Sequence, residues 1–139
     1  MSLLSLSPSK RGRLAAVGLA CVVLIPASRA ATPTELLSGY TTRAGSPAAP
    51  ARGQQFFSAR HGREWSCTSC HGATPTQTGK HASTGKPINA LAPAFNPERF
   101  TDAAKSEKWF RRNCNDVVGR ECTDAEKADV LSWLLTLKP

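Results

Sequence analysis

The sequence is poor in several features, and each shortage removes a class of protein. Its longest apolar run is the twelve residues 14–25, "LAAVGLACVVLI", well short of the ~20 residues that a membrane-spanning helix needs. No stretch alternates polar and apolar residues as a half-buried strand does, so a sheet-based fold is not predicted. Methionine occurs only as Met1, which leaves no thioether side chain beyond the first residue.

The first thirty residues are typical of a secretory signal peptide. The positive segment Lys10–Arg13 precedes the apolar run, and "SRA" at residues 28–30 offers small residues for cleavage. We therefore predict a cleaved leader over residues 1–30 and one exported, periplasmic domain over residues 31–139.

The positive charge of the whole chain is partly a property of this leader. Removing residues 1–30 removes four of the 18 basic residues and none of the ten acidic ones, which lowers the formal net charge from +8 to +4. So modest a charge argues against nucleic-acid binding and is compatible with docking to an acidic protein.

Residues 67–71 read "CTSCH", the attachment pattern of a c-type haem. Cys67 and Cys70 would form thioethers to the two vinyl groups of one haem c, and His71 would bind the iron. A zinc site would need a second ligand pair with suitable spacing. A CxxC redox protein that binds no haem would need a βαβ framework, for which the sequence gives no indication.

Two further cysteines of the exported domain, Cys114 and Cys122, are then left to pair. Export places them where disulfides persist. Their bridge would close a nine-residue loop, a constraint valued at roughly 2.5 kcal/mol by the chain-entropy argument.

The chain pattern predicts an all-α fold. Capping boxes start helices at Pro33, which should run to about Thr41, and after Thr123. Residues 52–60 form a further expected helix, and Thr101 is the expected cap of another. Residues 72–100 show no helical period, and wrapping a flat cofactor would explain so long an irregular stretch. With five Phe, three Trp and one Tyr, the core needs the apolar surface of a haem.

The helices around the motif resemble class I c-type cytochromes. Gly53 with Phe57 resembles that family's N-terminal helix, where glycine allows a close crossing by the C-terminal helix. The pair Trp133-Leu134 resembles the crossing partner.

The second axial ligand of the iron is left open by the residues alone. Class I electron carriers commonly use methionine, which is absent here. The candidates are His61, His81, a lysine or an oxygen donor. His61 lies so close to the motif that reaching the other face is awkward, and His81 is either a ligand or a solvated loop residue. Asn113 and Asn115 flank Cys114, and their residue type favours helix-end capping or turn chemistry.

The run from "TGKPINALAP" to "EKWFRRNCNDVVGREC" resembles the sphaeroides haem protein family. The resemblance covers nearly all of residues 31–139, and its motifs "TGK", "LAP" and "RNC" go beyond the generic attachment pattern. It implies an oxygen-binding monohaem cytochrome c with an asparagine as sixth ligand. Carried over, that ligand is Asn113, with Asn115 as the fallback, and the family disulfide is Cys114–Cys122.

The same resemblance implies a redox partner and small ligands. Electrons would come from a dihaem cytochrome c fed by a membrane cytochrome b, and ferrous haem would bind O2, NO or CO. Trp109 and Phe110 would either line the distal pocket or pack in the core. No catalytic acid or base stands out, so oxygen reduction, peroxide handling and nitric oxide binding remain alternative roles. The first rival is a plain electron carrier with His71/His81 ligation, and the second is a CxxC redox or metal protein without haem.

Overall fold

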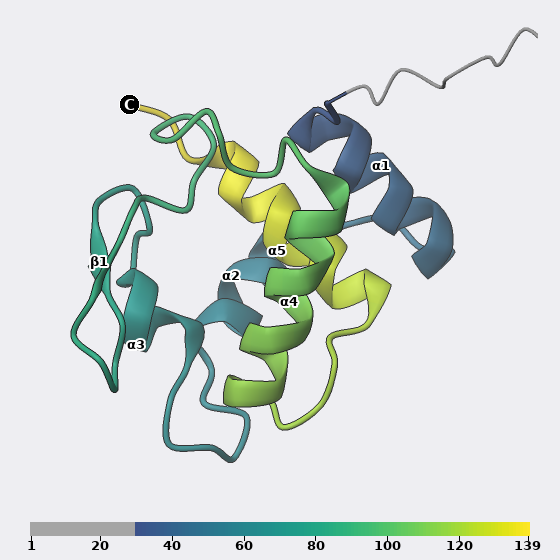
Figure 1. Cartoon of the computed structure of the whole chain (residues 1–139). Helices are drawn as coiled ribbons and strands as arrows, with labels where there is room; N and C mark the ends of the chain where they lie inside the picture. Colours follow the sequence, from purple (N-terminus) through teal and green to yellow (C-terminus); the bar gives the residue numbers. More distant parts are fainter. Residues whose placement is uncertain (1–29) are drawn as a thin grey trace, which may run out of the picture.

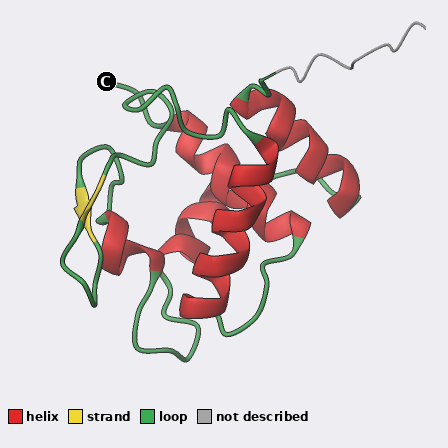
Figure 2. Ribbon diagram, in the orientation of Figure 1, coloured by secondary structure: helices red, strands yellow, loops and turns green. Residues whose placement is uncertain are grey.

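The computed structural model describes residues 30–139, so the predicted leader, apart from Ala30, lies outside the described residues. Five helices follow one another with one short strand pair between them (Figure 2). They are α1 (Pro33–Ala44), α2 (Pro50–Ser58), α3 (Cys67–His71), α4 (Ala103–Val117) and α5 (Asp124–Thr136). No helix of residues 30–139 has the length and apolar character to span a bilayer.

Helix α5 forms the centre of the fold (Figure 1). Every residue from Ala128 to Leu134 is buried, which is expected of a helix enclosed by neighbours on all sides. Helices α1 and α2 both pack closely along α5. Helix α4 lies in front of α5 in Figure 1 and makes fewer close backbone approaches to its neighbours than α1 and α2 do.

The crossing of α2 over α5 depends on Gly53, as its position in the sequence predicted. A Cβ at this residue would overlap the carbonyl oxygen of Asp129 and lie 2.8 Å from the backbone nitrogen of Val130. Beside the crossing, the rings of Phe57 and Trp133 lie 5.0 Å apart. The two backbones can approach this closely only because one of them carries no side chain at the contact.

The two helix starts that were predicted from capping boxes are confirmed. Thr32 and Glu35 cap α1, and Thr123 and Glu126 cap α5. The start of α4 differs, because Asp102 is its cap and accepts a hydrogen bond from the Lys105 backbone nitrogen at 2.9 Å. The Thr101 hydroxyl instead donates to the carbonyl oxygen of Glu98.

The expectation of no strands is wrong in one place. Strands β1 (Gly79–Lys80) and β2 (Pro87–Ile88) pair antiparallel within the irregular stretch. The tight turn between them is closed by hydrogen bonds from His81 N to Lys86 O at 2.8 Å and from Gly85 N to His81 O at 2.9 Å. Strands of two residues are too short for polar and apolar alternation to mark them in the sequence.

Candidate functional site

The "CTSCH" motif forms α3, a single helical turn. At its start the backbone nitrogen of Ser66 donates to the Ser69 hydroxyl at 3.0 Å. At its end Gly72 has φ of 78° and donates its N–H to Thr68 O at 2.9 Å. That left-handed φ favours glycine, so the residue after His71 stops the helix abruptly.

The two thiols and the imidazole of the motif emerge from this one turn. Cys67 and Cys70 are both free and three residues apart, a spacing that puts them on the same side of a helix. Burial raises the pKa of the Cys67 thiol to about 11. Burial also lowers the pKa of His71 to about 4, with the charge of Arg99 adding to the effect. The turn therefore presents a protonated Cys67 thiol and a neutral His71 imidazole, the form of histidine that binds metals.

Apolar side chains surround the turn on the side of α2 and α5. The rings of Phe57 and His71 lie 6.1 Å apart. Cys67 and Leu91 both pack against the buried cluster that contains Phe57 and Trp133. The attachment turn is thus continuous with the apolar core.

Arg99 is a half-buried cation beside the attachment turn. Its Nε donates to Ala90 O at 3.0 Å and its Nη2 to Asn89 O at 2.7 Å. Burial lowers the pKa of its guanidinium, and no carboxylate of residues 30–139 forms an ion pair with it. A partly buried positive charge of this kind calls for an anionic partner.

The two candidate asparagines lie on opposite sides of α4. Residues two apart on a helix differ by about 200° in direction. Asn113 is partly buried and follows the inward residues Ser106 and Phe110 at helical spacing, whereas Asn115 is exposed. Both lie inside the helix, which continues to Val117, so the expectation that they cap or turn its end is wrong.

The two aromatic residues before Asn113 also have different surroundings. Phe110 is partly buried and packs edge-on against Tyr40, with ring centroids 5.7 Å apart. Trp109 is 43% exposed and has the Arg112 guanidinium 5.7 Å from its ring centroid. Phe110 therefore packs in the core and Trp109 does not, whereas lining of the distal pocket, the other alternative, stays a prediction for both residues.

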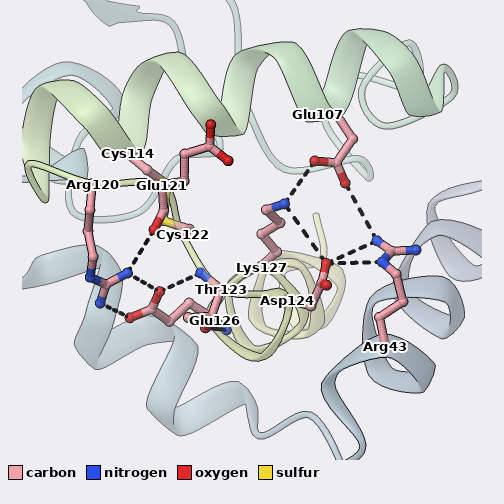
Figure 3. A network of polar contacts seen from close by, with 10 residues as sticks. All are labelled: Arg43, Glu107, Cys114, Arg120, Glu121, Cys122, Thr123, Asp124, Glu126 and Lys127. Carbon is pink, nitrogen blue, oxygen red and sulfur yellow. Dashed lines mark hydrogen bonds and ion pairs between the residues drawn. A yellow bond between two sulfur atoms is a disulfide. The ribbon is translucent and has the colours of Figure 1, made fainter.

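Helix α4 is tied to its neighbours at Glu107 and Cys114 (Figure 3), one before and one after Asn113 in the sequence. Glu107 pairs with Lys127 of α5 at 2.8 Å and with Arg43 of α1 at 3.5 Å. A disulfide joins Cys114 to Cys122, whose Cα atoms lie 5.6 Å apart. These contacts hold the backbone around Asn113 in place.

The two histidines outside the motif are engaged in local contacts. The Nε2 of His61 lies 2.8 Å from Phe56 O, and its ring contacts the Phe56 ring. His81 lies in the hairpin turn, where its Nδ1 is 3.2 Å from the Ser83 hydroxyl.

The chemistry of the turn fits a covalent haem better than either rival that lacks one. A nucleophilic CxxC pair has a lowered thiol pKa, whereas burial raises that of Cys67. Among residues 30–139, no three His, Cys, Asp or Glu side chains gather as metal ligands. Two free thiols, an adjacent neutral imidazole and an unpaired cation match the vinyl groups, iron and carboxylates of one haem.

Sequence reasoning missed Arg99 beside the attachment turn and Asp129 at the crossing of α2 and α5. No sequence pattern marked Arg99 as buried, because its surroundings depend on its hydrogen bonds to the carbonyl oxygens of Asn89 and Ala90. Asp129 is buried in α5, where it binds the Arg52 guanidinium at 2.7 Å and the Ala49 backbone nitrogen at 2.6 Å. An acidic residue inside the apolar stretch "ADVLSWLL" was the available signal for Asp129.

Comparison with known proteins places the chain among c-type cytochromes. A family model described as a domain of unknown function (DUF1924) matches residues 43–134. The cytochrome c-type protein SHP of Cereibacter sphaeroides is 50% identical over 107 residues, which are 74% of this chain and 82% of that protein.

Two solved structures share the fold. One is oxidised SHP, described as an oxygen-binding cytochrome c, with 47% identity, a TM-score of 0.73 and coverage of 78% of this chain and 99% of that one. The other is the solution structure of cytochrome c'' from Methylophilus methylotrophus, described as giving insight into haem-ligand detachment. Its identity is 36% and its TM-score 0.67, and the match covers 77% of this chain and 94% of that one.

Proposed function

Because the chain belongs to the family of the cytochrome c-type protein SHP and has its all-α cytochrome c fold, we propose that it is a periplasmic monohaem cytochrome c that accepts electrons and binds O2, NO or CO when ferrous, after release of Asn113. The observation that carries the proposal is the position of Asn113. It is a neutral oxygen donor on the inward side of α4, in a chain whose only methionine is Met1.

The residues of α3 and the following loop would hold the cofactor. Cys67 and Cys70 would form the two thioethers, and His71 would be the proximal ligand. Arg99 would pair with a haem carboxylate, which supplies the anionic partner that its burial calls for. When bound, the haem supplies an iron that changes between ferric and ferrous states and takes a ligand on each face.

The amide oxygen of Asn113 is suited to a ligand that is held in only one oxidation state. It is a hard, neutral and weak donor, which favours ferric over the softer ferrous iron. Because Glu107 and the Cys114–Cys122 disulfide fix the backbone on either side of it, release would be a rotation of the Asn113 side chain. The helix itself would stay in place.

The relatives support this reading. SHP is described as oxygen-binding, and the description of cytochrome c'' concerns detachment of a haem ligand. For this chain, we propose that a dihaem cytochrome c fed by a membrane cytochrome b is the electron donor.

The optical spectrum of the haem-loaded protein tests the proposal. We expect covalent haem absorbance that survives acid–acetone extraction, and a high-spin ferrous spectrum that shifts at once when CO is added. The physical reason is that the Asn113 amide would bind only ferric iron, so that reduction would leave one side of the iron open to CO.

Two other results would separate the rivals. A low-spin ferrous spectrum indifferent to CO would contradict gas binding and favour His71/His81 ligation. Absence of covalent haem from protein matured in a cell with a cytochrome c attachment system would favour the CxxC protein without haem.

A further inference from the structure

The segment around the attachment turn contains no acidic residue. Between Glu64 and Glu98, the only Lys or Arg side chains are Lys80 and Lys86. Both are exposed and lie in the hairpin formed by β1 and β2. Neither forms an ion pair with a carboxylate of residues 30–139. Their charges are therefore available to a partner, and no acidic residue of this segment offsets them.

This hairpin lies directly against the attachment turn, beside α3 in Figure 1. The backbone nitrogen of Ala82 donates to the Sγ of Cys70 at 3.3 Å. A Cβ at Gly79 would overlap the carbonyl oxygen of Cys70 and lie 3.1 Å from the Cα of His71. Only the backbone of the hairpin therefore separates the attachment turn from the protein surface on this side.

We propose that the hairpin Gly79–Ile88 is the surface on which an acidic, one-electron redox protein docks to reduce this cytochrome, an inference that rests on the proposed function. Opposite charges orient such encounters and raise association rates by ~10- to 1,000-fold. Electron transfer slows steeply with distance, so a docking face should lie close to the cofactor. One electron leaves the partner and is accepted by the ferric iron that His71 would hold, and no bond to the partner is made.

Helix α4 carries a second basic surface, which provides a matched comparison. Lys105, Lys108 and Arg112 are exposed there beside Trp109. This surface also contains Asp116, and α3 packs chiefly against β1 and α2 instead of α4. We therefore assign docking to the hairpin.

The test compares two double charge reversals in the haem-loaded protein. Lys80→Glu with Lys86→Glu alters the hairpin, and Lys105→Glu with Lys108→Glu makes the same net change on α4. Reduced flavodoxin, an acidic one-electron donor, is mixed with each ferric protein in a stopped-flow instrument at several salt concentrations. Neutral riboflavin semiquinone is used as a donor without net charge.

We expect the hairpin variant to be reduced by flavodoxin at least tenfold more slowly at low salt and to lose the decrease of rate with added salt. The α4 variant should stay within about twofold of the parent. Riboflavin should reduce all three proteins equally, which shows that the haem itself is unchanged.

Equal losses in the two variants, or a larger loss in the α4 variant, would overturn the hairpin assignment. The outcome is separable from the proposed function, because CO binding by the ferrous parent is measured independently. If the ferrous parent protein does not bind CO but the hairpin variant is still reduced more slowly by flavodoxin, the docking site is supported and gas binding is refuted.

Discussion

Gly53→Ala is expected to lower the free energy of unfolding by about 3 kcal/mol, at the upper end of the usual cost of overpacking. The new Cβ would overlap the backbone of α5 at Asp129. Backbone cannot turn aside as a flexible side chain can, so α2 must move away from α5. Urea denaturation of the haem-loaded protein, followed by far-ultraviolet circular dichroism, measures the change.

Gly39→Ala is the matched control for this substitution. Gly39 lies in α1, where an added Cβ would meet only the Nη1 end of Arg43 at 3.4 Å. Replacing a helical glycine by alanine there should stabilise the protein by up to about 1 kcal/mol. Opposite signs for the two glycines are expected, whereas equal effects would show that the α2–α5 crossing does not depend on Gly53.

Much of the fold was predictable because its signals are local. Capping boxes mark the starts of α1 and α5, and each depends on two side chains three residues apart. The start of α4 was misplaced by one residue, because Thr101 and Asp102 are both good caps and local preference does not separate them. Phe100 has φ of 61° beside this start, and its ring packs against that of Phe110 with centroids 6.1 Å apart.

In the candidate site, too, some features follow from the local sequence and others depend on the fold. The attachment turn could be predicted from five consecutive residues, because its geometry is contained in one helical turn. The environment of Arg99 could not, since it depends on carbonyl groups of residues 89 and 90 brought together by the fold. For the asparagines, residue type favoured a helix end, and only the family resemblance pointed to Asn113.

The extent of α4 supplies the physical reason to distinguish the two asparagines. Because the helix continues through residue 117, the directions of Asn113 and Asn115 are fixed by helical geometry. The partly buried Asn113 faces the same side as Phe110, and the exposed Asn115 faces away from it. We therefore propose that Asn113, and not Asn115, would reach a haem held by α3, and exchanging either residue tests this directly.

Asn113→Ala is expected to convert the ferric spectrum to a high-spin or water-ligated form. The ferrous and CO-bound spectra should stay the same, because the proposed Asn113 bond exists only in the ferric state. The reduction potential should rise, since a ligand that favours ferric iron has been removed. Optical spectra and a redox titration of the haem-loaded variant measure both effects, and together they exclude a merely structural role for the amide.

Asn115→Ala is the matched control, because it makes the same change two residues away on the outer side of α4. It should leave the ferric spectrum and the reduction potential unaltered. Reversed effects would identify Asn115 as the ligand and would require α4 to be rotated relative to the arrangement described here. If neither variant changes the ferric spectrum, the sixth ligand comes from another element, and His81→Ala is the next substitution because His81 is the only histidine of residues 72–100.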